Sequence, residues 1–102
     1  MKADKVLSLA GLAARAGKVE SGEFAVEKAI KTGKAYLVIA AEDASFNTEK
    51  KFRNSCAWYH VEFRKYSDKE TLGHAIGRQQ RAVIAVNDEG LAKAILASVD
   101  QC

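Results

Sequence analysis

Hydrophobic residues recur at intervals of three and four along much of this chain, with polar residues between them. Near the amino terminus, Val6, Leu9, Ala10 and Ala13 follow this spacing, which places them on one face of an α-helix. The same period, together with capping residues such as Ser, Asn and Asp, predicts five helices. They cover 4–16, 22–32 with Ser21 as its cap, 47–59 with Ser45 or Asn47 as its cap, 68–77, and a last helix that starts at Asn87 or Asp88.

Continuous apolar runs separate some of these helices. The runs 35–41 and 82–86 are typical of strands buried on both faces, as in a sheet covered by helices. The segment 61–66 alternates between apolar and polar residues, which predicts a less buried strand. Residues 18–20 form a very short extended piece. Because helices and strands alternate throughout, the chain predicts an α/β fold: a three-layer α/β/α sandwich with a mixed sheet of about four strands.

Length and composition favour one cytoplasmic domain over 1–102. The 102 residues contain no proline, and no linker-like or low-complexity segment divides them. Two cysteines do not make a disulfide framework, which favours the reducing cytosol. The segment Ala14-Arg15-Ala16 resembles a signal cleavage site, but Arg15 and Lys18 fit an amphipathic helix that ends at Gly17 better. No apolar run reaches the length of a membrane span, so we expect no membrane partner.

Charge alone does not identify a partner. The net charge is +3, from 16 basic and 13 acidic residues, which is a weak excess for a protein that binds nucleic acid. Its distribution is more informative, because residues 88–102 hold Lys93 against Asp88, Glu89 and Asp100. The remainder of the chain is therefore more basic than the total indicates.

The sequence contains little that points to catalytic chemistry. No spacing joins Ser, His and acidic residues into a triad, and the two cysteines lack metal-ligand spacing. We interpret His60 and His74 as surface residues, and the glycines of 73–77 as close packing and a helix cap. Glu42-Asp43 follows a buried strand, where α/β proteins often bind ligands, but without a second acidic cluster a capped loop is the better interpretation. We therefore expect no enzyme, metal, cofactor or small-molecule substrate.

The predicted second helix carries a more informative surface. With Val26 and Ile30 turned toward the core, Phe24, Lys28 and Lys31 fall on the opposite face. Lysines neutralise phosphates, a helix start binds anions, and an exposed ring stacks on an unpaired base. Lys18 and Gly22, in the approach to this helix, add to the surface. Lys18 supplies a cation, and Gly22 allows a close backbone contact. From these residues alone, a solvated helix face with Phe24 folded against its own loop explains the pattern equally well.

A second candidate surface is the segment Arg78-Gln79-Gln80-Arg81, which precedes a buried strand. Arginines contact phosphates, and glutamines contact base edges. An ordinary polar loop has the same composition, and taken alone the segment favours that interpretation.

Several motifs occur in the order of a known pattern: Gly17-Lys18-Val19, Gly22, Lys28-Ala29-Ile30, Gly33-Lys34-Ala35, 37–43 and 72–77. Over nearly the whole chain, this order resembles the ribosomal kink-turn-binding family, and in particular its bacterial YlxQ-type members. The resemblance implies an α/β/α sandwich that binds RNA kink-turns without catalysis. It also implies contacts from the start of the second helix, Gly22 to Lys28 and including Glu23, and from the loop Gly77 to Ala82. Both surfaces chosen from residue chemistry coincide with these segments.

The chain also departs from the family pattern. Phe24-Ala25 replaces the Asn-Glu pair that reads G·A base pairs in well-known members, while Lys28 matches the family lysine. Arg78 to Arg81 replaces an apolar loop, and Ser45 replaces an acid. We therefore predict a monomeric, ribosome-associated protein for structured RNA, in which basic contacts replace part of the base readout. The alternative is a protein-interaction module on the same fold.

Overall fold

A four-stranded mixed sheet forms the centre of the computed structural model, which describes residues 4–101. The strands are β1 (Val19–Ser21), β2 (Leu37–Ala40), β3 (Glu62–Lys65) and β4 (Val83–Val86). Their spatial order is β1-β4-β2-β3, with β4 antiparallel to both of its neighbours and β3 parallel to β2. The two apolar runs form the central strands, because only there are both faces covered by helices.

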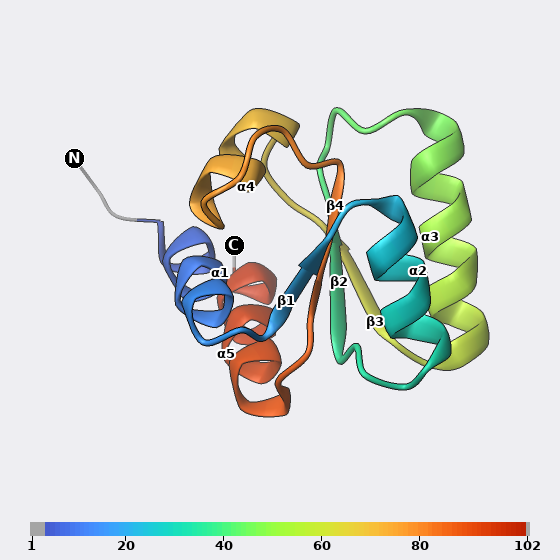
Figure 1. Cartoon of the computed structure of the whole chain (residues 1–102), viewed down its shortest axis with the longest axis horizontal. Helices are drawn as coiled ribbons and strands as arrows, with labels where there is room; N and C mark the ends of the chain where they lie inside the picture. Colours follow the sequence, from blue (N-terminus) through green and yellow to red (C-terminus); the bar gives the residue numbers. More distant parts are fainter. Residues whose placement is uncertain (1–3, 102) are drawn as a thin grey trace.

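Within residues 4–101, five helices cover the two faces of the sheet (Figure 1). They are α1 (Lys5–Arg15), α2 (Glu23–Lys31), α3 (Phe46–Tyr59), α4 (Lys69–Ala75) and α5 (Glu89–Asp100). Helices α1, α4 and α5 pack on one face, around Leu37, Ile39 and Ile84. Helices α2 and α3 pack on the other face, around Val38 and Phe52. The predicted three-layer α/β/α sandwich is confirmed.

In the part of the chain that the structure describes, side-chain caps begin four of the five helices. Asp4, Ser45, Asp68 and Asp88 each accept a backbone hydrogen bond from the residue three positions later. The prediction that Ser21 caps the second helix is wrong. Gly22 occupies the cap position of α2 with φ +91° and no side-chain cap, because Ser21 is the last residue of β1.

One edge of the sheet gathers several helix starts and loops. Strands β1, β2 and β3 end there and β4 begins there, because β4 runs opposite to its neighbours. Helices α2, α3 and α4 start at this edge, and the loop before β4 returns to it (Figure 1). The carboxyl ends of strands are where α/β folds commonly bind ligands. The start of α2 and the loop before β4, which are the centres of the two surfaces predicted from the sequence, lie at this edge.

Candidate nucleic-acid interface

The start of α2 and the loop before β4 lie side by side. Gly22 donates its backbone N–H to the carbonyl of Val83 at 3.1 Å, which extends the pairing of β1 with β4. Arg81 then reaches across, and its Nε donates to the Ser21 hydroxyl at 3.0 Å. Gly22, Glu23, Gln80 and Arg81 line one hollow of about 320 Å³. Two segments about 60 residues apart in sequence thus form one surface.

Arg81 is the residue that holds this junction together. Its Nη1 donates to the carbonyl of Gln80 at 2.8 Å, while its Nε is held by Ser21. Neither bond uses Nη2, so this nitrogen can still donate to a phosphate oxygen. Arg78 and Arg81 both line a second hollow, together with Ala14, Glu20 and Ile76. A fixed guanidinium beside an exposed one is a suitable surface for a phosphate backbone.

Close packing against α4 fixes the position of the loop. The carbonyl of Gly73 accepts the N–H of Arg78 at 2.8 Å, and the carbonyl of Lys69 accepts the N–H of Arg81 at 3.0 Å. The loop backbone comes so close that a Cβ on Gly73 would lie 1.7 Å from the Gln79 carbonyl oxygen. The sequence interpretation of close packing at Gly73 is confirmed, and so is the helix end at Gly77, where φ is +77°.

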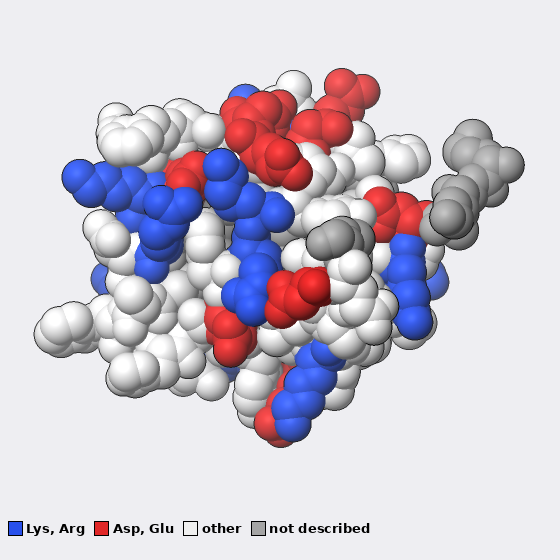
Figure 2. Space-filling view, turned by 180° about the vertical axis from the view of Figure 1, so that it is seen from behind, with Lys and Arg blue, Asp and Glu red and all other residues white. Residues whose placement is uncertain are grey.

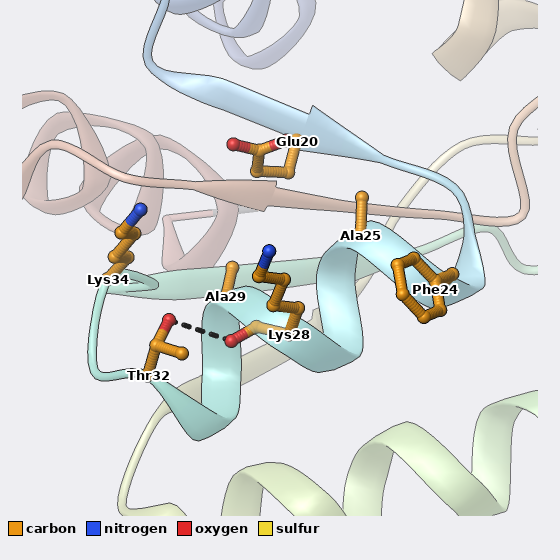
Figure 3. A pocket seen from close by; sticks show the side chains of 7 residues that line it. All are labelled: Glu20, Phe24, Ala25, Lys28, Ala29, Thr32 and Lys34. Atoms are coloured by element: carbon orange, nitrogen blue, oxygen red, sulfur yellow. Dashed lines mark hydrogen bonds between the residues drawn. The ribbon is translucent and has the colours of Figure 1, made fainter.

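Helix α2 presents an open groove of about 230 Å³ beside the edge strand β1. Phe24, Lys28, Thr32 and Lys34 line it, with Glu20 on the opposite side. Figure 3 shows the amino groups of Lys28 and Lys34 turned toward Glu20, and the hydrogen bond from the Thr32 hydroxyl to the Lys28 carbonyl at 2.8 Å. The groove therefore offers two cations beside one carboxylate.

Phe24 is 84% exposed, at the first turn of α2. The interpretation in which this ring folds against its own loop is therefore wrong. Because α2 has no side-chain cap, its first backbone N–H groups add partial positive charge near the ring. A ring, a cation four residues later and an uncapped helix start can stack on a base and hold its phosphate.

Three predicted residues take other positions or partners. The Lys31 Nζ lies 3.4 Å from Glu27 Oε1, and the Nζ of Lys51, in α3, lies 3.4 Å from Glu27 Oε2. This ion pair holds Lys31 away from the groove. Lys18 precedes β1 and pairs through its carbonyl with the N–H of Asn87, at the opposite end of β1 from Gly22. The separation of Lys18 from Gly22 along the strand is about 13 Å. Glu23 accepts a hydrogen bond from the Thr48 hydroxyl at 3.1 Å, which ties α2 to α3.

The sequence interpretation missed Lys34. Gly33, with φ +75°, ends α2 and turns the chain back, so Lys34 comes to lie beside Lys28. Glycine followed by lysine at a predicted helix end is the signal that predicts this placement. The sequence pattern holds no comparable signal for the partner of Lys31.

Acidic residues border the junction on the α4 side. Asp43, Asp68 and Glu70 outnumber Lys69 around a hollow that Gln80 also lines, and Figure 2 shows acidic side chains gathered at this edge of the molecule. The Asp43 carboxylate accepts the backbone N–H of Lys69 at 2.8 Å. Hydrogen bonds from the Thr71 N–H and hydroxyl hold the pKa of Asp68 below its usual value. This acidic border repels phosphates and so limits where a polyanion can lie.

Residues 4–101 give no support for metal binding, a membrane-spanning helix or thiol chemistry. No group of three or more His, Cys, Asp or Glu residues there is arranged to hold a metal ion. No helix in that range is both long and apolar enough to cross a bilayer. His60 and His74 are exposed, as the sequence predicted. Burial raises the pKa of the Cys56 thiol to about 12, which makes it a poor nucleophile.

The fold and this junction define a small α/β/α protein of the kind that ribosomal RNA-binding domains use. Residues 4–96 match the model of the Ribosomal protein L7Ae/L30e/S12e/Gadd45 family, and the chain belongs to that family. It is 45% identical over 92 residues to the RNA-binding protein YlxQ of Bacillus subtilis (strain 168), covering 90% of this chain and 92% of that protein. It is 40% identical over 90 residues to the RNA-binding protein YlxQ of Enterococcus faecium, covering 87% and 85%. The predicted resemblance to YlxQ-type members is confirmed.

Solved structures agree with this assignment. A protein of unknown function from Bacillus halodurans C superimposes with a TM-score of 0.93 at 40% identity, over 96% of this chain and 99% of that one. The 15.5kD RNA binding protein of Giardia lamblia superimposes with a TM-score of 0.81 at 23% identity, over 94% and 82%. At this identity, the likeness to the Giardia protein concerns the fold.

Proposed function

We propose that this chain is a non-catalytic RNA-binding protein that recognises structured, kink-turn-like RNA. The observation that carries the proposal is the junction itself, where Arg81 is fixed on Ser21 beside the uncapped start of α2. The names of the two YlxQ relatives support an RNA partner. A sharply bent duplex brings two backbones close together, and two neighbouring basic segments can contact both at once.

The contacts divide by chemistry. Phe24 supplies a face for an unpaired base, and Lys28 reaches phosphate or a base edge from the next turn of α2. Arg78 and Arg81 neutralise phosphates from the loop, and Gln79 and Gln80 contact sugar or base edges. Because cations replace part of the base readout, affinity should fall steeply as salt concentration rises. We propose that this chain is a single cytoplasmic domain that binds ribosomal RNA as a monomer.

A titration with three RNAs tests the proposal. We expect the protein to bind a kink-turn duplex more tightly than a straight duplex of equal length at the same salt concentration. Lys28→Ala and Arg81→Ala should each weaken binding by about 1–3 kcal/mol, and each lost phosphate contact should lower the salt slope by about one. A kink-turn carrying inverted G·A pairs should bind no better than the straight duplex if recognition depends on the bend.

Lys93→Ala is the matched control for these variants. Lys93 lies on α5, on the other face of the sheet, and pairs with Glu89 at 3.3 Å. The substitution removes the same charge without touching the junction, so only a small change in affinity is expected. Equal affinity for bent and straight duplexes, or equal losses from Lys93→Ala and Arg81→Ala, would refute the proposal.

A protein-interaction module on the same fold is the second candidate function. The exposed ring of Phe24, beside Ala25 in place of a polar pair, favours it. Capture of cell partners with and without ribonuclease separates the two functions. Partners that survive ribonuclease and are lost in Phe24→Ala support protein binding, while partners released by ribonuclease support RNA binding.

A further inference from the structure

The outward face of α3 carries the two most exposed aromatic rings of this helix, and Tyr59 at its end is less exposed. Phe46 is 73% exposed and Trp58 is 79% exposed, while Phe52 and Cys56 bury the opposite side of the helix. Phe46, Lys50, Asn54 and Trp58 are spaced four residues apart and are all exposed, so they form a slowly winding row. We call these four residues the α3 row. It is about 18 Å long, at 1.5 Å of rise per residue.

The α3 row alternates apolar rings with polar groups. The Lys50 ammonium lies 6.0 Å from the centre of the Phe46 ring, and Asn54 stands between Lys50 and Trp58. Lys51 and Arg53 flank the row and pair with Glu27 and Glu49, respectively. Two rings separated by a cation and an amide do not form the contiguous apolar patch of a protein interface. They match a single nucleic-acid strand, in which bases alternate with phosphates.

The α3 row begins beside the proposed RNA junction. Thr48, in the first turn of α3, donates its hydroxyl to Glu23, in the first turn of α2. The starts of both helices therefore share one edge of the sheet, and α3 runs from there along the side of the molecule (Figure 1). Asp68 and Glu70 at the start of α4, and Asp43 in the loop before α3, border the junction and outnumber Lys69 there. A polyanion that leaves the junction is repelled by these carboxylates and is attracted by Lys50, in the second turn of α3. Lys51 and Arg53 beside it are already paired with Glu27 and Glu49.

We infer that the α3 row binds a single-stranded extension of the RNA held at the junction. Phe46 and Trp58 stack on unpaired bases, and Lys50 neutralises the phosphate between them. This inference rests on the proposed function for the identity of the RNA, but the row has its own probe. Trp58 is the single tryptophan of the chain, so its fluorescence reports on the row alone.

In the first measurement, a short oligouridine is titrated into the protein while the intrinsic fluorescence of Trp58 is recorded. We expect quenching, because a base stacked on the indole ring is an efficient quencher, and we expect Lys50→Gln to weaken it. Lys93→Gln should leave it unchanged, since Lys93 lies on α5, away from both the junction and the α3 row. An acidic peptide of the same length is the second arm. Quenching by the peptide and not by oligouridine would overturn the inference and assign the row to a protein partner.

The second measurement compares a kink-turn duplex with and without a single-stranded uridine extension, by fluorescence anisotropy of labelled RNA. The extension should tighten binding by about tenfold, the effect expected from stacking on one exposed ring. Trp58→Leu and Lys50→Gln should abolish that gain while leaving affinity for the blunt duplex unchanged. Lys93→Gln is the matched control, and it should keep the whole gain.

The outcomes distinguish failure of this inference from failure of the proposed function. If bent and straight blunt duplexes bind equally, the proposed function fails, whatever the extension does. If the bent duplex is preferred but the extension adds nothing, or if its gain survives both variants, the inference about α3 is wrong. Should Trp58→Leu fold poorly, Lys50→Gln and the quenching of the unmodified protein still decide the outcome.

Discussion

The contact between Gly73 and the loop before β4 predicts that one added methyl group disables the junction. In Gly73→Ala, the new Cβ would lie 1.7 Å from the Gln79 carbonyl oxygen, 2.6 Å from its carbonyl carbon and 3.1 Å from the Arg81 nitrogen. The backbone around Gln79 must therefore retreat by about 1.3 Å, because packed atoms in proteins do not approach more closely than about 3.0 Å. These atoms belong to the backbone, so no rotamer change relieves the clash.

The expected loss of stability follows from the hydrogen bonds that this backbone shift breaks. The hydrogen bonds from Arg78 to Gly73 and from Arg81 to Lys69 hold this segment, and each contributes about 1 kcal/mol. Overpacking adds about 1–3 kcal/mol, and the better helix propensity of alanine returns about 1 kcal/mol. The free energy of unfolding should therefore fall by about 2–4 kcal/mol. Affinity for a kink-turn duplex should fall by about tenfold or more, because Arg78 and Arg81 move together.

Urea unfolding and RNA titration together test this reasoning. Gly90→Ala is the matched control, since its Cβ would meet only the Asp88 carboxylate at 3.5 Å, an ordinary contact. The control should keep its RNA affinity and gain about 0.5–1 kcal/mol of stability. A folded Gly73→Ala protein that binds RNA as tightly as the unchanged chain would show that the position of the loop does not matter for binding.

Three further predictions concern the fold. The buried Cys56 thiol, with its pKa raised to about 12, should resist a thiol reagent at pH 8 in a Cys102→Ser background and react only after unfolding; rapid labelling of the folded protein would contradict its burial. Because Thr71 lowers the pKa of Asp68, the stabilising effect of this cap is present above the ordinary value of 3.8 and is lost as pH falls below it. The stability difference between the unchanged chain and Asp68→Ala, followed by urea unfolding, should therefore shrink from pH 7 to pH 2, and a difference that stays constant would contradict this assignment. His60 ends α3 with φ +60°, so His60→Gly should raise the free energy of unfolding by up to about 1 kcal/mol, and a loss of stability would indicate a hidden contact of the imidazole.

Much of the site could be predicted from the sequence because it depends on local periodicity. The spacing of Val26, Ala29 and Ile30 fixes which side of α2 is buried, and the exposed side then includes Phe24 and Lys28. Side-chain partners do not follow from periodicity. Lys31 has nearly the same helical position as Phe24, yet Glu27 holds it near Lys51, a residue of a different helix.

The sequence by itself determined the layers of this protein. Two apolar runs could be buried only as central strands, and the helical stripes could be satisfied only by packing against them. Local chemistry also determined most helix starts, because a capping side chain bonds to a backbone group three residues away.

Only the tertiary structure decided how the two predicted surfaces meet. The reversed direction of β4 brings the loop before it to the same edge as the start of α2, and no local pattern encodes strand direction or neighbour order. Ser21 illustrates the difference. A serine before a helical stripe predicts a helix cap, but the pairing of β1 with β4 places Ser21 at the end of a strand, where its hydroxyl accepts a hydrogen bond from Arg81. Contacts between residues far apart in sequence depend on the whole packed sheet. Each contact can form only when the order and direction of the strands bring its two residues together.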